Sequence, residues 1–408
     1  MRRSIDLDPG LPLLPALLRE EEQFLFRRVA DQQRTVLCVG EQEVLPGPPC
    51  DLHGPVNDWC TLSIDYEWLL PDGSEAPHND GAPCVRWTRP RWVVDRHPDR
   101  AVLHVHPDSG VDPADLAHRL VTGIHDPGER LETDWKLTTD KATYLANVEL
   151  LLRHVQRGDI YEVNYCTERT ALWPQLEPYV AFLRLLQRSG APFAAFHRLG
   201  DRFVLSASPE RFLAFDGPRV VGEPMKGTRP RSPDPDTDDR LRQELMSDAK
   251  ERSENIMALD VMRHDLSRIA DRASVVVNEL CAVRTYPRVH QLVSTVSARM
   301  APGVTVEQVV RAAFPMASMT GAPKERAMEL IAGVEGAPRG AFSGTLGFFA
   351  PDGTADLNVV IRALVFDRRT GVVSLRTGSA LTALCDPAAE WEECQVKARS
   401  VIDALAHA

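Results

Sequence analysis

Between residues 203 and 221, three strand-like stretches follow one another with no helix between them, and this order of elements limits the possible folds most. The stretches are Phe203–Ser206, Arg211–Phe215 and Arg219–Val221, and Asp216-Gly217 is a strong turn signal between the last two. Upstream, Lys141–Arg157 predicts a helix that Gly158 ends, and residues 160–166 predict a strand. Strands and helices that do not alternate strictly indicate an α+β fold rather than a doubly wound sheet.

Two longer stretches have helical periodicity. Leu241–Ile269 carries apolar residues at i, i+3, i+7 and i+10, and Pro387–Leu405 carries a similar stripe that begins at Trp391. Each predicts one long helix with a buried face. Asp386 is expected to cap the start of the second helix.

The first 135 residues have a different texture. Proline and glycine interrupt them often, as in residues 46–56, with short apolar runs such as Thr35–Val39 and Ala101–Val105 between. We therefore predict a strand-and-loop region over residues 1–135 that packs on a core, and a catalytic domain over residues 136–408. Repeats and low-complexity linkers are not apparent in the sequence.

Composition excludes several classes of protein. The chain has 408 residues and a net charge of −11, which argues against nucleic-acid binding because phosphate backbones are held by dense basic surfaces. No apolar run approaches the ~18 residues of a membrane span, and the eight cysteines show no C-x-x-C pair. We expect a cytoplasmic protein with reduced thiols, no membrane attachment and no zinc site.

Two titratable residues lie near the Asp216-Gly217 turn. If the flanking strands form a hairpin, Glu210 lies opposite Glu223, and Lys226 lies roughly 10 Å further along. Burial could free Lys226 as a neutral amine nucleophile and keep Glu210 protonated as an acid. The alternative is an edge lysine that pairs with Glu223 at the surface.

The two long helices each carry paired carboxylates. Glu251 and Glu254 share one face of the first, and Glu390, Glu393 and Lys397 share one face of the second. Such hard oxygen ligands suit Mg²⁺, although glutamates at this spacing are also common on solvated helix faces. A third feature, residues 318–324, ends a small-residue turn at Pro323, which marks a helix start able to receive a carboxylate.

Seven segments together resemble the chorismate-utilising family, which includes component I of anthranilate synthase and of aminodeoxychorismate synthase, isochorismate synthases and salicylate synthases. The resemblance runs from about residue 140 to residue 400. It rests on residues 158–164 (GDIYEVN), 208–212 (SPERF), 224–231 (PMKGTRPR), 250–257 (KERSENIM), 289–294 (VHQLVS), 320–324 (TGAPK) and 386–393 (DPAAEWEE).

The resemblance implies an α+β fold with two packed antiparallel sheets flanked by helices, around a Mg²⁺-dependent chorismate site. It implies Glu254 and Glu393 as metal ligands, with Glu251 and Glu390 supporting the metal through water. The residues expected to hold the substrate are Thr228, His290, Ser318, Thr320, Gly321, Ala322, Arg362, Gly378 and Lys397.

The resemblance also suggests which reaction is catalysed. Aminodeoxychorismate synthases carry a lysine at the position of Lys226, where most other members carry alanine. In those enzymes the lysine attacks C2 of chorismate as the 4-hydroxyl leaves, and ammonia then attacks C4 and expels the lysine. Glu210 would protonate the leaving hydroxyl. Members that use water look to carry a lysine base where this chain has Glu162, so attack by water is disfavoured.

The resemblance therefore implies the activity of aminodeoxychorismate synthase component I, which makes 4-amino-4-deoxychorismate for folate or a specialised metabolite. A glutamine amidotransferase partner is expected to supply the ammonia. Four positions depart from the family pattern, namely Glu162, Ala317, Phe342 and Ala380. Alternatives are anthranilate synthase component I, which the lysine at 226 argues against, and a catalytically silent chorismate-binding subunit, which retention of Lys226, Glu210 and the four glutamates argues against.

Overall fold

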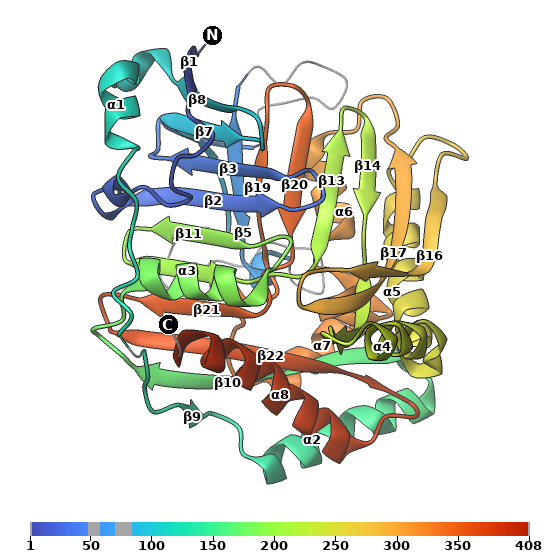
Figure 1. Cartoon of the computed structure of the whole chain (residues 1–408). Helices are drawn as coiled ribbons and strands as arrows, with labels where there is room; N and C mark the ends of the chain where they lie inside the picture. The colour runs from blue at the N-terminus through green and yellow to red at the C-terminus, as the bar shows by residue number, and fades with distance from the viewer. Residues whose placement is uncertain (1, 48–57, 70–83, 130, 407–408) are drawn as a thin grey trace.

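The computed structural model describes residues 2–47, 58–69, 84–129 and 131–406. Two antiparallel sheets dominate it, and their strands run in crossing directions in Figure 1. This confirms the predicted α+β fold with two packed sheets. Most of residues 46–56, which were interpreted as loop, lie outside the described residues.

The first sheet contains twelve strands. In order across it they are β1 (Arg3–Leu7), β8 (Ala101–Val105), β7 (Trp92–Arg96), β3 (Arg34–Val39), β2 (Gln23–Val29), β11 (Ala195–Leu199), β12 (Arg202–Ser206), β21 (Ala363–Asp367), β22 (Val372–Thr382), β10 (Glu162–Leu172) and β18 (Gly321–Ala322), with β9 (Lys136–Leu137) paired to β10.

The second sheet contains ten strands. In order across it they are β15 (Met225–Pro230), β17 (Val289–Arg299), β14 (Arg219–Gly222), β13 (Arg211–Asp216), β20 (Thr354–Asn358), β19 (Thr345–Phe349), β5 (Cys60–Ile64), β6 (Val85–Arg89) and β4 (Glu43–Leu45), with β16 (Val276–Thr285) paired to β17.

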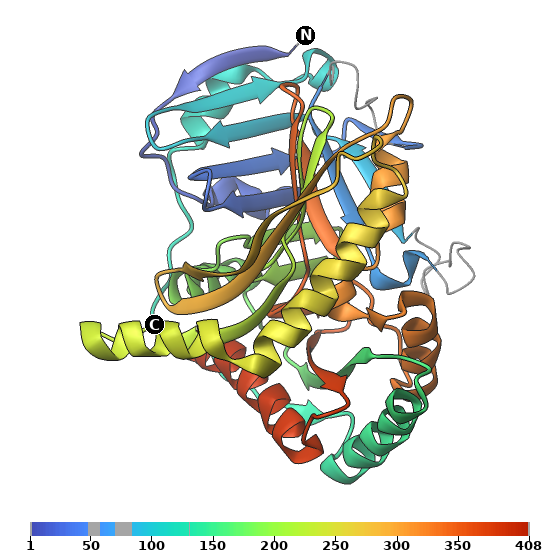
Figure 2. The ribbon, with the colours of Figure 1, turned by 90° about the vertical axis from the view of Figure 1, so that its right-hand side faces the viewer.

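Helices cover the outer faces of the sheets. Their bounds are α1 (Pro113–Arg119), α2 (Lys141–Arg157), α3 (Pro178–Ser189), α4 (Pro235–Ser247), α5 (Ala249–Ser267), α6 (Val306–Ala313), α7 (Lys324–Val334) and α8 (Pro387–Ala406). In Figure 1, α3 and α8 lie across the first sheet, and Figure 2 shows α5 running diagonally across strands of the second. Of the helices in the described ranges, none is both long enough and apolar enough to span a membrane.

Apolar side chains fill the space between the two sheets. Leu25, Val36 and Val204 from the first sheet and Leu346 and Phe348 from the second belong to the buried clusters there. These residues alternate along their strands with residues on the opposite face, as a two-layer packing requires. Side chains from strands in both halves of the sequence thus pack in one core.

Both sheets continue across the boundary predicted near residue 135. β2 pairs with β11 in the first sheet, and β5 pairs with β19 in the second. Among the described parts of residues 1–135, five strands belong to the first sheet and three to the second. The division into two domains stays a prediction, but the N-terminal region is hydrogen-bonded into the same sheets as the rest.

Two local predictions are wrong. The helix predicted over Leu241–Ile269 is two helices, because Asp248 between α4 and α5 has an extended conformation and accepts a hydrogen bond from the Glu251 N–H at 3.1 Å. Such a side-chain acceptor satisfies a free amide at a helix start, so the chain turns there and begins again. An apolar period cannot show this break, since it continues through both helices.

The register of the β13–β14 hairpin also differs from the prediction. Asp216 pairs with Arg219 and Leu213 with Gly222, so the loop consists of Gly217 and Pro218. Pro218 has no N–H to give a ladder bond, and Gly217 has a positive φ of 54°, which suits a loop position. Glu210 therefore does not lie opposite Glu223.

Candidate functional site

Glu210 directly precedes β13 and is 4% exposed. Its backbone is held on both sides: its N–H donates to the Ser208 hydroxyl at 3.2 Å, and its carbonyl accepts from the Val359 N–H at 3.1 Å. Burial raises the pKa of Glu210 to about 7, opposed by the nearby Ser318 hydroxyl, Lys226 and the Met225 N–H. A carboxyl in this state can serve as a proton donor near neutral pH.

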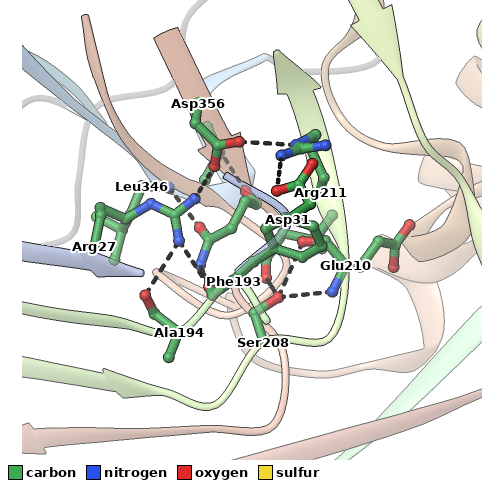
Figure 3. A network of polar contacts seen from close by, with 12 residues as sticks. Arg27, Asp31, Phe193, Ala194, Ser208, Glu210, Arg211, Leu346 and Asp356 are labelled. Carbon is green, nitrogen blue, oxygen red and sulfur yellow. Dashed lines mark hydrogen bonds and ion pairs between the residues drawn. The ribbon is translucent and has the colours of Figure 1, made fainter. Parts of the chain in front are cut away.

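A charged network lies behind Glu210. Arg211 donates to Asp356 at 2.8 Å, to Glu223 at 2.6 Å and to Asp31 at 2.7 Å, and Asp356 also pairs with Arg27. Figure 3 shows the Glu210 carboxyl pointing away from this network, while Arg211 points into it. The network thus fixes the strand that presents Glu210 without occupying its carboxyl.

Lys226 lies on β15, and its side chain is 10% exposed. Its Nζ donates to Glu162 Oε1 at 2.6 Å and lies 3.8 Å from Glu254 Oε2. The alternative pairing with Glu223 is wrong, since Glu223 binds Arg211 and Arg284. Burial lowers the pKa of Lys226, but the charges of Glu162 and Glu254 outweigh it, so the pKa lies above its usual value.

Lys226 is therefore a paired ammonium in this structure, which corrects the expectation of a lysine made neutral by burial. Glu162 comes from β10 of the first sheet, whereas Lys226 comes from the second. Sequence reasoning treated Glu162 as a departure from the family pattern and as evidence against attack by water, not as a partner of Lys226. No local signal could have paired two residues so far apart in sequence.

The predicted metal ligands come from α5 and α8. Glu254 and Glu390 are buried, and burial raises the pKa of both, that of Glu254 to about 7. Glu251 Oε1 lies 3.6 Å from Arg229 Nη1. Glu393 pairs with Lys397 at 2.6 Å; burial would raise its pKa, but Lys397, Lys250 and Lys226 hold it below its usual value.

These carboxylates fit a divalent cation without forming a closed ligand set. Within the described residues, no three His, Cys, Asp or Glu side chains are arranged to hold a metal by themselves. However, Glu254 Oε1 and Glu390 Oε2 are buried and make no hydrogen bond within the described residues. Buried, unbonded carboxylate oxygens are costly alone and are the ligands that Mg²⁺ prefers, so the residues present suit that ion.

Two of the predicted substrate-binding residues line one cavity of about 610 Å³, which includes Thr228, Pro209, Gln291 and Arg362 in its wall. Arg362 has a positive φ of 49°. Within the described residues its guanidinium makes no hydrogen bond or ion pair; burial lowers its pKa, and the charge of Glu393 opposes that effect. Its carbonyl accepts from the Ala207 N–H at 3.1 Å. A strained residue with an unpaired cation beside a cavity suits an anionic ligand.

The segment from Ser318 to Ala322 lies against β10. Glu162 pairs with Ala322 and Val163 with Gly321, and the Thr320 carbonyl accepts from the Asn164 N–H at 2.7 Å. The Thr320 hydroxyl donates to Met316, so this side chain is already bonded. The following helix α7 begins at Lys324, with Pro323 before it, close to the predicted start.

The remaining predicted residues are placed as follows. Lys397 Nζ donates to the Gly378 carbonyl at 2.7 Å, which joins α8 to β22 near Glu393.

His290 is 1% exposed, and both ring nitrogens have protein partners, Thr285 at 2.9 Å and Asp238 at 3.0 Å. A role for His290 in binding substrate therefore stays a prediction with no free ring nitrogen to support it. Asp386 caps α8 as predicted, accepting from Ala388 and Ala389.

Residues 21–403 match the profile of the chorismate binding enzyme family. The chain belongs to the family of chorismate-binding enzymes. It is 44% identical over 271 residues to an aminodeoxychorismate synthase of Streptomyces griseus, covering 66% of this chain and 37% of that protein. It is 37% identical over 275 residues to aminodeoxychorismate synthase component 1 of Escherichia coli, covering 67% of this chain and 60% of that protein. The chain thus spans less than two thirds of the length of these relatives.

Solved structures of chorismate-binding enzymes share the fold over nearly the whole chain. The menaquinone-specific isochorismate synthase of Escherichia coli has a TM-score of 0.77 at 18% identity, covering 98% of this chain and 95% of that one. Anthranilate synthase component I of Streptococcus pneumoniae has a TM-score of 0.72 at 20% identity, covering 98% and 92%. These likenesses confirm the predicted fold.

Proposed function

We propose that this chorismate-binding enzyme converts chorismate and ammonia to 4-amino-4-deoxychorismate, with Mg²⁺ as cofactor. The observation that carries the proposal is a buried Lys226, paired with Glu162, whose charge acts on a protonatable Glu210. Relatives that are 37% and 44% identical to this chain are named aminodeoxychorismate synthases, which supports the same reaction here.

Lys226 is the proposed nucleophile. Its amine attacks C2 of chorismate, the ring double bonds shift and the C4–O bond breaks, so lysine becomes bonded to C2. Ammonia then attacks C4, the double bonds shift back and the C2–N bond to Lys226 breaks. Because Lys226 is an ammonium in this structure, it must first lose a proton, and Glu162 Oε1 at 2.6 Å is the carboxylate placed to accept it.

Glu210 is the proposed acid. Protonating the 4-hydroxyl lets it leave as water, and a carboxyl with a pKa of about 7 holds that proton near neutral pH. The guanidinium of Arg362 and the Thr228 hydroxyl are proposed to bind the carboxylates of chorismate.

Mg²⁺ would be held by Glu254 and Glu393, with Glu251 and Glu390 bonded to its water ligands, and would neutralise a substrate carboxylate. A glutamine amidotransferase is the proposed partner that supplies ammonia. The name of the Escherichia coli relative, a component 1, supports a further component.

The first test is to incubate the purified protein with chorismate, Mg²⁺ and an ammonium salt at alkaline pH and to identify products by mass and retention. Aminodeoxychorismate that an added lyase converts to p-aminobenzoate is expected. Anthranilate or isochorismate would assign a different reaction, and no turnover with or without an amidotransferase would indicate a silent subunit.

Lys226→Ala tests the covalent step. We expect amination at C4 to be lost or redirected to another product, because the alanine side chain cannot form the bond to C2. Lys141→Ala is a matched control, since Lys141 is an exposed lysine paired at 3.5 Å with Glu392. An unchanged rate and product in Lys226→Ala would remove covalent catalysis from the proposal.

A further inference from the structure

Lys250 binds the same carboxylates that were proposed for the cation. It lies in the first turn of α5, and its Nζ donates to Glu390 Oε1 at 2.7 Å and lies 3.8 Å from Glu254 Oε1. The side chains of Glu390 and Glu254 are only 2% and 7% exposed, whereas that of Lys250 is 46% exposed. One ammonium thus reaches from the solvent side and joins carboxylates of two helices.

The ammonium leaves both carboxylates incompletely bonded. Glu254 Oε1 and Glu390 Oε2 are buried and accept no hydrogen bond within the described residues. An ammonium carries one charge and three donors, while two carboxylates carry two charges and about eight acceptor sites. A divalent ion with its own water ligands compensates such a pair more fully.

Lys226 differs from Lys250 in how it contacts Glu254. It lies 3.8 Å from the other oxygen, Glu254 Oε2, and its buried Nζ is fixed by Glu162 at 2.6 Å. The side chain of Lys226 is 10% exposed, whereas that of Lys250 is 46% exposed. Lys250 can move its charged end into water while its apolar stem stays on the protein surface.

We propose that Lys250 is an intramolecular competitor for the divalent cation, neutralising Glu254 and Glu390 until Mg²⁺ displaces its ammonium into solvent. The proposal rests on the metal site of the proposed function. A metal ion bound to these oxygens would lie close to the ammonium, and two cations at that distance repel each other strongly in a buried site. Metal binding and the Lys250 contact therefore exclude each other.

Lys250→Met tests the competition, because methionine keeps the apolar stem and removes the charge. Mg²⁺ binding is measured by titration calorimetry without chorismate. If the lysine-bound state holds about nine tenths of the protein, its removal tightens Mg²⁺ binding about tenfold. Unfolding without Mg²⁺ should occur at a lower temperature than in the native protein, and Mg²⁺ should raise that temperature by a larger amount.

Lys141→Met is the matched control. Lys141 pairs with Glu392 of α8 at 3.5 Å, but both side chains are more than half exposed, at 52% and 56%. Its Mg²⁺ affinity should equal that of the native protein. Equal or weaker Mg²⁺ binding by Lys250→Met would overturn the proposal, since it would make Lys250 a support for the metal rather than a competitor.

A second measurement uses the native protein and so does not depend on whether the variant folds. An amine-acetylating reagent is applied with and without Mg²⁺, and peptides are quantified by mass spectrometry. Lys250 should be acetylated several-fold faster with Mg²⁺, while Lys141 is unchanged. Equal acetylation of Lys250 in both conditions would overturn displacement.

Both readouts omit chorismate and ammonia, so they succeed or fail independently of amination. Failed amination with Mg²⁺-dependent release of Lys250 would reject the proposed reaction and keep this inference. Absence of any Mg²⁺ binding by the native protein would overturn this inference, whatever product the enzyme forms with chorismate.

Discussion

Burial shifts the pKa values of the two residues proposed for catalysis in opposite directions. It favours the neutral form of each, which raises the pKa of Glu210 to about 7 and would lower that of Lys226. The outcome differs because the charges of Glu162 and Glu254 both raise the pKa of Lys226 and outweigh burial, whereas the charge of Lys226 lowers the pKa of Glu210 by less than burial raises it. The charges of the neighbouring side chains therefore decide how far burial shifts the pKa of each residue.

The pKa of Glu210 predicts a pH dependence. A general acid must be protonated, so kcat/KM at constant free NH₃ and saturating Mg²⁺ should fall above about pH 7, by about tenfold per pH unit. Glu210→Gln should lower kcat by about 10²- to 10⁴-fold and abolish this decline. The measurement is a kcat/KM profile from pH 5.5 to 9. A decline that persists unchanged in Glu210→Gln would assign it to another group.

The sequence predicted Glu210 and Lys226 because both lie within short recognisable segments. It did not predict that Glu162 binds Lys226 or that Lys250 binds Glu390, because each contact joins residues from elements far apart in the chain. Lys250 did carry one local signal, since it precedes Glu254 by four residues on the same helix face. Side-chain partners across a fold depend on register and packing, which local patterns do not encode.

At the scale of elements, the break at Asp248 determines where α5 begins and so where Glu251 and Glu254 point. Asp248 accepts from the Glu251 N–H and also binds Arg229 of β15 at 2.7 Å. One side chain thus starts the helix and attaches it to the strand that carries Lys226. Helix periodicity predicted the buried face of α5 correctly, with Leu259, Met262 and Leu266 in the core, but not its start.

β18 is held so close to β10 that only glycine fits at residue 321. A Cβ on Gly321 would lie 2.1 Å from the Glu162 carbonyl oxygen, and its φ is +153°. Gly321→Ala should therefore push β18 off β10, lower the free energy of unfolding by about 1–3 kcal/mol and weaken chorismate binding. Denaturant unfolding and equilibrium binding measure the two effects.

Gly333→Ala is the control for this substitution. Gly333 is exposed near the end of α7, and a Cβ there would meet nothing within 4 Å. Alanine in a helix is favoured over glycine by about 0.5–1 kcal/mol, so this variant should be as stable as the native protein or slightly more. Equal stability of the two variants would contradict the close approach at Gly321.

At the scale of the whole molecule, buried charges join the two sheets. Arg27 comes from β2 of the first sheet, and Asp356 and Arg211 come from β20 and β13 of the second (Figure 3). Arg27 also donates to the carbonyl of Phe193, which precedes β11, at 2.7 Å. It thus contacts the chain next to the first sheet as well as Asp356 of the second sheet. Through Arg211 this network reaches the start of β13, which Glu210 directly precedes, and so links residues 1–135 to the candidate active site.

Asp356→Asn tests how much this link stabilises the protein. Asp356 lies between the guanidinium groups of Arg27 and Arg211. The asparagine would leave Arg27 buried without its carboxylate partner, whereas Arg211 keeps its ion pairs with Glu223 and Asp31. Removing one partner of a buried ion pair costs about 3–5 kcal/mol, which should appear in denaturant unfolding. Asp260→Asn is the control, because its pair with Arg263 is exposed and should contribute about 1 kcal/mol or less.

The shape of the Asp356→Asn transition carries a second result. Because β2 and β5 are hydrogen-bonded to strands of the C-terminal region, loss of the network should lower the stability of the whole structure in one cooperative step. Fluorescence and far-UV circular dichroism should then report the same midpoint. Two separated midpoints would show that residues 1–135 unfold alone and would support the two-domain division predicted from the sequence.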